Sequence, residues 1–474
     1  MTSIFGIDFG TAYTKVQARD EEERLYIIRD ITGKALTIPS EVYIDKAGQV
    51  YFGLKARDEH IEHINDVSKG KEGFFFSDIK IVLIHAAEGK REEIRKLEQE
   101  IRETLDTLKN PPGPFSIVTY SIAHSLAEAQ KIFKKSFNKE ISLDKLKVNF
   151  SHPSLQLESC FLTNPDNPGG TIRYEEYIKK AVARALYLSQ YIKSDECPVG
   201  ELMSHAIESM EFQEEFKKNL SCDYEPACAI SEILKNYPEA EEGIYILIDI
   251  GAGTTDIGVL LKESPSNNKL LLHYSEPIGD SKVDNILIEE IKSLQKKEIE
   301  SLTEEKSQAL EGLLKRRIRA IKEKLISDSS DELNLSELSL TPIELHLSMF
   351  ESKLREGYLN QILEKLKQYL SNIREALVEK GYKQPIRKIF VSGGGSFFVQ
   401  KYGIIEELSI NEPVIYTSDV GGFPELSEED MRLQGVALGL AHADVEPSSP
   451  PPLNPSKIRR IIEEMPDYGD KETQ

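Results

Sequence analysis

An aspartate followed by a glycine turn with hydroxyl residues occurs twice in the chain, each time at the end of an apolar run. The first copy is Ile7-Asp8-Phe9-Gly10-Thr11, and the second is Ile248-Asp249-Ile250-Gly251-Ala252-Gly253-Thr254. Glycine turns suit phosphate groups, because the backbone can approach closely and present its N–H groups. The two carboxylates suit Mg²⁺, which binds a few carboxylates together with phosphate oxygens and retained waters. The repeat therefore indicates a phosphorylated ligand and its magnesium ion.

A third glycine motif lies near the end of the chain, where an apolar run leads into Ser392-Gly393-Gly394-Gly395-Ser396. One such motif alone is more often an ordinary turn with capping residues. Three of them in a fixed order are hard to explain by chance, so we interpret them as parts of one binding site.

The elements that must position these turns can be inferred from the flanking residues. A second apolar run follows each aspartate-bearing turn, at Tyr13 to Val16 and at Asp256 to Leu261. Apolar run, turn and apolar run predict a β-hairpin. Two such hairpins, about half a chain apart, predict a duplicated fold with two similar lobes facing each other.

Helices are predicted for much of the remaining chain. Apolar residues recur every three or four positions from Ile94 to Leu108, which is typical of an amphipathic helix. Further helices are expected at about 116–137 and, with an interruption near 327–337, at about 287–377. The apolar stretch Val436 to Ala441 is expected to be the last element of the folded body.

Composition excludes several classes of function. With 59 basic and 80 acidic residues the net charge is −21, which argues against a primary role on nucleic acid or anionic lipid. No apolar run approaches the roughly 18–20 residues that span a bilayer, and the N-terminus lacks the pattern of a signal peptide. The four cysteines lack zinc-site spacing and are expected to be reduced thiols. We therefore expect a cytoplasmic protein.

The order of the three glycine loops resembles the two phosphate motifs and the adenosine motif of actins, hexokinases and 70-kDa heat-shock proteins. Other segments resemble the heat-shock branch in particular, and together they extend the resemblance over about residues 3–442. These segments are Ile38-Pro39-Ser40-Glu41-Val42, Ser77-Asp78-Ile79-Lys80, Val148-Asn149-Phe150-Ser151-His152-Pro153, Tyr224-Glu225-Pro226-Ala227-Cys228-Ala229 and Val436-Ala437-Leu438-Gly439-Leu440-Ala441.

The resemblance implies an α/β fold, a duplicated actin-like ATPase fold in which two lobes with mixed sheets flanked by helices surround a central nucleotide cleft. Lobe I is expected at residues 1–242 and lobe II at residues 243–442. The remaining residues, 443–474, are expected to be a flexible tail rich in proline and charge.

The resemblance also implies roles for individual residues. It places the phosphates at Gly10, Thr11, Ala12, Tyr13, Gly251, Gly253, Thr254 and Thr255, and the adenosine at Gly393, Gly394, Gly395 and Ser396. It assigns catalysis to Lys80, Glu225, Asp249, Asp256 and Thr254, and it assigns Mg²⁺, held through water, to Asp8 and Asp249. The same carboxylates are expected to organise a monovalent cation such as K⁺ and the attacking water.

Two implied roles have strong alternatives. Lys322 or Lys324, with Ser327, lies near the family's base-contacting pattern, but the register differs by one or two residues and a solvated helix face explains these residues equally well. Glu225 could instead favour the start of a helix, because an acidic side chain there complements the helix dipole.

The implied function is slow, Mg-dependent ATP hydrolysis by a chaperone-like switch. The first turn has Ala12 where the family has a second threonine, and the second has Ala252 and Thr255 where glycine and an aromatic are usual, so the rate is expected to be low. We expect residues 443–474 to serve neither as the family's apolar linker nor as its peptide-binding domain, and we expect a separate protein to sense ATP or ADP. The alternatives are an ATP-dependent filament-forming protein and a regulatory module with little turnover. A sugar kinase fits less well.

Overall fold

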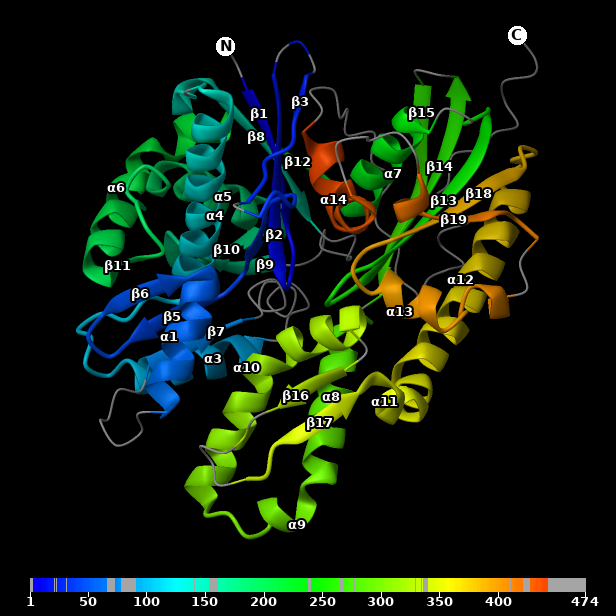
Figure 1. Ribbon diagram of the computed structural model, residues 1–474. Coiled ribbons are helices and arrows are strands. Elements are labelled where there is room, and N and C mark those ends of the chain that lie inside the picture. Colours follow the sequence, from blue (N-terminus) through cyan, green and yellow to red (C-terminus); the bar gives the residue numbers. More distant parts are fainter. Residues whose placement is uncertain are drawn as a thin grey trace.

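The chain forms a mixed α/β structure with several sheets, as the computed structural model in Figure 1 shows. It describes residues 3–441 except 21, 23, 31, 66–72, 78–90, 140, 153–160, 238–239, 265–266, 277, 329, 334, 336–339, 409–410 and 421–426. Among these residues no helix is both long and apolar enough to cross a membrane.

The N-terminal sheet has the strand order β12-β8-β1-β2-β3, and β4 also pairs with β2. Strands β1 and β2 form an antiparallel hairpin, β8 lies parallel to β1, and β12 lies parallel to β8. The strands are β1 (Ser3–Phe9), β2 (Tyr13–Asp20), β3 (Leu25–Tyr26), β4 (Thr37–Pro39), β8 (Leu146–His152) and β12 (Leu220–Tyr224).

The C-terminal sheet has the order β15-β14-β13-β18-β19 and repeats this pairing pattern. Strands β13 and β14 form the antiparallel hairpin, β18 lies parallel to β13, β19 lies parallel to β18, and β15 pairs antiparallel with β14. The strands are β13 (Gly243–Ile250), β14 (Thr255–Ser264), β15 (Asn267–Glu276), β18 (Ile386–Ser392) and β19 (Val414–Tyr416). Strand β13 is apolar along nearly its whole length, as expected for a central strand covered on both faces.

Three smaller sheets complete the strand content of the described residues. The largest has the order β11-β6-β5-β7, and the other two are the hairpins β9–β10 and β16–β17. The strands are β5 (Val42–Asp45), β6 (Gln49–Phe52), β7 (Gly73–Phe76), β11 (Glu196–Pro198), β9 (Phe161–Asn164), β10 (Asn167–Arg173), β16 (Ser330–Leu333) and β17 (Ile343–His346).

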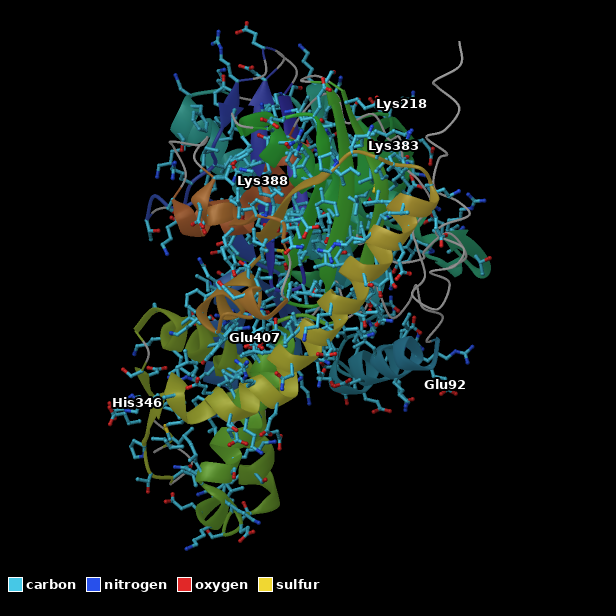
Figure 2. All side chains as sticks on the ribbon, turned by 90° about the vertical axis from the view of Figure 1, so that its right-hand side faces the viewer. Glu92, Lys218, His346, Lys383, Lys388 and Glu407 are labelled. Carbon is cyan, nitrogen blue, oxygen red and sulfur yellow. The ribbon has the colours of Figure 1, made fainter. Side chains whose placement is uncertain are left out.

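Helices from both parts of the sequence pack around these sheets. Those before β13 are α1 (Gly53–Asn65), α3 (Arg91–Thr104), α4 (Pro114–Phe137), α5 (Tyr174–Leu188), α6 (Val199–Lys217) and α7 (Glu225–Asn236). Those after it are α8 (Ser281–Leu294), α9 (Lys296–Ile299), α10 (Glu304–Asp328), α11 (Leu347–Leu354), α12 (Asn360–Glu379), α13 (Ser396–Lys401) and α14 (Glu428–Leu440). In Figure 2, Glu92 of α3 and His346 at the end of β17 lie on opposite sides of the lower part of the molecule. This lower part therefore contains elements from before and from after β13.

Helices α7 and α14 lie side by side between the two large sheets (Figure 1). On α14, Val436 and Leu440 pack into a core cluster with residues of β13 and α7, whereas Leu438 packs against Ile27 and Ala35 of the N-terminal part. The last helix of the chain is therefore shared by the two parts of the fold.

Two glycines allow this close packing. A β-carbon at Gly6 of β1 would lie 2.2 Å from the carbonyl oxygen of Ala437, and one at Gly439 of α14 would lie 2.1 Å from that of Cys228. Both approaches are to backbone atoms, which cannot move away as a flexible side chain can. Backbone therefore packs directly on backbone along the β1–α14–α7 contact.

Polar side chains join the same elements. Arg19 of β2 forms a buried ion pair with Glu232 of α7, with 2.7 Å between Nη2 and Oε1. Gln17 donates from Nε2 to Oε1 of Gln434 at 2.8 Å, and Asn149 donates from Nδ2 to the Leu440 carbonyl oxygen at 2.8 Å. These three side chains thus each have a partner across the contact, which avoids the desolvation cost of an unpaired buried group.

Several predicted elements are confirmed. Both hairpins form as expected, the predicted helix at 116–137 is α4, and β18 leads into the third glycine loop. The helix predicted to reach Leu108 ends earlier, at Thr104, and Leu105 is buried in the turn that follows. The cysteines that the structure describes, Cys197, Cys222 and Cys228, are free thiols, whereas Pro153 and the tail 443–474 lie outside the described residues.

Adding a side chain at Gly439 should weaken the packing of α14. We expect Gly439→Ala to lower the free energy of unfolding by about 1–3 kcal/mol, the usual cost of overpacking a tight contact. Gly435→Ala is the control on the same helix, because its β-carbon would meet ordinary contacts of 3.7 and 3.9 Å. Urea unfolding of both variants measures the difference, and equal midpoints would contradict the packing described for α14.

Candidate functional site

The first glycine turn is closed by backbone hydrogen bonds. The N–H of Gly10 donates to the carbonyl oxygens of Asp8 at 3.1 Å and Tyr13 at 3.2 Å. A β-carbon at Gly10 would lie 2.5 Å from the Tyr13 carbonyl oxygen, so only glycine fits. Ser40 supports the turn, since its Oγ donates to the Gly10 carbonyl oxygen and its N–H donates to that of Ala12.

Four polar side chains gather beside this turn. Lys15 of β2 stands opposite Asp8 in the hairpin, and its Nζ lies 2.5 Å from Oδ2 of Asp8. The hydroxyl of Ser151, on the neighbouring strand β8, lies 3.3 Å from Oδ1 of Asp8 and 3.4 Å from Oε1 of Glu225. One serine thus connects the carboxylate at the end of β1 with the one at the start of α7.

Glu225 also lies close to the second sheet. It is the first residue of α7 and is 4% exposed. The next residue, Pro226, packs on β14, where a β-carbon at Gly258 would lie 3.0 Å from the Pro226 Cβ. This placement agrees with either interpretation of Glu225, as a site residue or as an acidic residue in the first turn of a helix.

The second glycine turn has the same construction as the first. The N–H of Gly251 donates to the Thr254 carbonyl oxygen at 2.8 Å, and Thr254 donates from Oγ1 to Oδ2 of Asp256 at 2.7 Å. Asp256 stands opposite Asp249 in the hairpin, where the first hairpin has Lys15 opposite Asp8. The hydroxyl of Thr255 donates to the Ile278 carbonyl oxygen at 2.6 Å, so it stabilises the fold in this conformation.

The third glycine loop lies directly against the second turn. Gly393 has a φ of 85°, which favours glycine, and a β-carbon there would lie 2.5 Å from Oδ1 of Asp249. The N–H of Gly395 donates to the Ile250 carbonyl oxygen at 2.9 Å. Ser396 follows as the first residue of α13 and is fully buried.

The beginning of α8 meets the same turn. The N–H groups of Asp280 and Ser281 donate to the carbonyl oxygens of Gly251 at 3.0 Å and Ala252 at 2.8 Å. A β-carbon at Gly394 would lie 4.0 Å from Oδ2 of Asp280. The second turn, the third loop and the start of α8 therefore converge, and they bring Gly253 and Thr254 near Gly393 and Gly394.

Lys322 of α10 is buried against α8. Its Nζ lies 2.7 Å from Oδ1 of Asp284 and 3.3 Å from Oδ2 of Asp280. Burial by itself would lower the pKa of Lys322, but the two carboxylates raise that pKa above its ordinary value. Burial raises the pKa of the Asp284 carboxyl, although Lys322 opposes this shift. Lys322, one of the two lysines predicted near the base, thus pairs with two aspartates, and its contact with the base stays a prediction.

An ion-pair cluster joins α1 and α10, which belong to different parts of the sequence. Arg57 binds the Glu41 carboxylate through two nitrogens, at 3.0 and 2.7 Å, and Nη1 of Arg319 lies 3.5 Å from Oε1 of the same carboxylate. The Arg319 guanidinium carbon also lies 5.9 Å from the centre of the Tyr13 ring. Arg319 therefore connects α10 with the first glycine turn.

The remaining predicted residues are placed as follows. Thr11 is buried and Ala12 partly buried within the first turn. Ser327 is exposed near the end of α10 and donates to the Lys324 carbonyl oxygen, and Lys324 pairs with Asp331. Lys80 lies outside the described residues. The roles of all these residues in binding or catalysis stay predictions.

Sequence reasoning did not select four residues that the fold brings to these turns. Lys15 could have been found, because a hairpin with a short turn after Phe9 places it opposite Asp8. Ser151 was noted only as part of a strand. Tertiary packing brings Asp280 and Arg319 near the glycine turns, and the spacing of residues in the sequence does not indicate this proximity.

No family model matches the sequence, and no curated protein sequence matches it significantly.

Replacing Lys322 should destabilise the fold. Lys322→Met leaves Asp280 and Asp284 without their buried cation, which should lower the free energy of unfolding by about 3–5 kcal/mol, and adding Asp284→Asn should recover part of this loss. Lys324→Met is the control on the same helix, because Lys324 is about half exposed and should contribute at most about 1 kcal/mol. Urea unfolding gives both values. A Lys322→Met variant as stable as Lys324→Met, with weaker nucleotide binding, would instead support the base contact.

Proposed function

We propose that the chain binds Mg·ATP between its two large sheets and hydrolyses it slowly, as a conformational switch with a duplicated actin-like fold. The switch would be chaperone-like, resembling the nucleotide-binding part of 70-kDa heat-shock proteins, and a separate protein would sense its state.

The observation that carries the proposal is the repeated construction of the two sheets. In each, an aspartate is the next-to-last residue of the first strand of a hairpin, a glycine turn closed by backbone hydrogen bonds follows, and two parallel strands continue the sheet on the same side. A ligand with several phosphates can be held by two such turns at once, because each offers backbone N–H groups and a carboxylate for the metal ion.

The side chains at these turns supply what phosphoryl transfer needs. Such a reaction depends mainly on positioning and on electrostatic stabilisation. Asp8 and Asp249 would hold the water shell of Mg²⁺, and Glu225, joined to Asp8 through Ser151, would orient the attacking water. Lys15 can neutralise Asp8 when no nucleotide is bound and can turn toward a phosphate when Mg²⁺ takes its place.

The contacts between α1 and α10 suggest how nucleotide binding would be transmitted. Glu41, Arg57 and Arg319 link the two parts of the sequence near the first turn, and α7 and α14 link them between the sheets. When the two large sheets close around a nucleotide, the contact of Glu41 and Arg57 with Arg319 would become tighter, and α7 and α14 would act as the pivot. A partner that senses the α1–α10 contact could then distinguish ATP from ADP.

A nucleotide-binding module with little turnover is the second candidate. It is favoured by Ala12, which offers no hydroxyl, and by the Thr255 hydroxyl, which donates to the Ile278 backbone. Such a module would bind ATP and ADP with similar affinity but would release almost no phosphate. A turnover assay distinguishes it from the slow ATPase.

Calorimetry with Mg·ATP and Mg·ADP tests the proposed binding. The unaltered chain should bind both, chelation of Mg²⁺ should weaken binding, and Asp249→Ala should reduce the rate of phosphate release by roughly a hundredfold or more, since it removes a metal-facing carboxylate. Asp58→Ala, an exposed substitution on α1, is the control and should hydrolyse at the unaltered rate. Absence of binding heat with either nucleotide would overturn the proposal.

The two lysines should differ in what they contribute. Lys80→Ala should reduce turnover by roughly a hundredfold or more and leave nucleotide affinity nearly unchanged, because Lys80 is proposed to stabilise charge in the transition state. Lys15→Ala should instead weaken Mg·ADP binding, because it removes a cation beside the first turn. Lys147→Ala, an exposed change on β8, should alter neither. Unchanged turnover in Lys80→Ala would show that the positional match is wrong.

A further inference from the structure

A histidine and two carboxylates meet on the side of α4, in a place that the proposed nucleotide site does not use. One ligand atom from each of His124, Glu128 and Asp195 can be chosen so that all three lie within 4.8 Å of one another. His124 and Glu128 are one helical turn apart on α4, and Asp195 directly precedes β11. Within the described residues, this is the one group of His, Cys, Asp and Glu side chains with such spacing.

Packing and strand pairing set the positions of His124 and Asp195. The His124 ring is 5% exposed and stacks on Phe52 at 4.8 Å between ring centres and 9° between planes. The Phe52 N–H donates to the Asp195 carbonyl oxygen at 2.9 Å, because β11 pairs with β6 from Glu196 onward. The imidazole and the Asp195 carboxylate are thereby brought to a separation of 2.9 Å between Nε2 and Oδ1.

The charges around the group favour a cation. Asp195 supplies one carboxylate, which faces the imidazole of His124. Glu128 adds a second carboxylate, whose partner is Lys131 at 3.0 Å, with a side chain that is 63% exposed and easily displaced. The other nearby lysine, Lys55, is paired with Glu196. One imidazole and two carboxylates thus offer three ligand atoms to a cation that displaces Lys131.

We propose that His124, Glu128 and Asp195 form a binding site for a divalent transition-metal ion, with zinc as the best match. Zinc takes imidazole nitrogen and carboxylate oxygen at about 2.0–2.2 Å, which places tetrahedral ligand atoms about 3.3 Å apart. The three ligand atoms lie within 4.8 Å of one another, so they would have to move closer together to bind zinc. Mg²⁺ fits less well, because it prefers oxygen ligands and retained water over imidazole.

A metal ion here would act on the small sheet that contains β6 and β11. It would fix the segment before β11 to α4, and through β6 it would stabilise β5 and β7 of the same sheet. Asp195 is half exposed, so the ion would be reached from solvent and could keep a water in its fourth position. The site is separate from the proposed nucleotide site and does not depend on it.

Zinc titration of the tag-free, chelator-treated full chain, followed by calorimetry without nucleotide, tests the proposal. We expect one zinc ion per chain and at least a tenfold loss of affinity in each of His124→Ala, Glu128→Gln and Asp195→Asn. His205→Ala is the matched control, because His205 pairs with Glu208 one turn along α6, and the part of the chain that the structure describes provides no third ligand there. The affinity of this variant for zinc should be unchanged.

Two outcomes would overturn the proposal. One is zinc binding of equal affinity in the unaltered chain and in the Glu128→Gln and Asp195→Asn variants, which change no buried ring and therefore remain informative if His124→Ala fails to fold. The other is a loss of zinc that follows His205 instead. Thermal melts of metal-free Glu128→Gln and Asp195→Asn should match the unaltered chain. Adding zinc should raise the melting temperature of the unaltered chain and of His205→Ala more than that of these two variants.

Discussion

The close contact of α7 and α14 between the two large sheets is the constraint on which the rest of the structure depends. These helices pack on strands of both sheets, and glycines at positions 6 and 439 let backbone approach backbone there. Buried partners such as Arg19 with Glu232 fix the relative position of the elements. Because α7 begins with Glu225, the same packing that joins the sheets also places a carboxylate between them.

This arrangement explains why the candidate site lies where it does. The N-terminal sheet offers one glycine turn with Asp8, and the C-terminal sheet offers the second turn and the third loop with Asp249. In the proposal, a polyphosphate would bind to turns of both sheets. Helices α7 and α14 pack on both sheets and so fix the position of one sheet relative to the other. Ser151 and Pro226 connect Glu225 to both sheets. The proposed activity therefore needs both sheets, while the proposed zinc site needs only α4 and the small sheet.

The sequence predicted the local features of this fold better than its tertiary contacts. The two hairpins and the third glycine loop were predicted because apolar runs interrupted by glycine turns are strong local signals in a sequence. The ion pairs of Lys322 with Asp280 and Asp284 could not be predicted, because they depend on how α10 packs against α8. The same holds for Arg319, which reaches Glu41 across more than 270 positions of sequence. The position of a lysine in a sequence motif does not show whether its side chain forms a buried ion pair or contacts the base of a nucleotide.

The most direct test of the account is amide hydrogen exchange of the full chain with and without Mg·ATP. If the nucleotide lies between the two sheets, the backbone N–H groups of residues 10–13, 251–255 and 393–396 should all exchange more slowly with Mg·ATP bound, although they belong to different sheets. A control in which ATP is present and Mg²⁺ is chelated should show much weaker protection. Protection confined to one sheet, or no change at any of the three loops, would contradict the account.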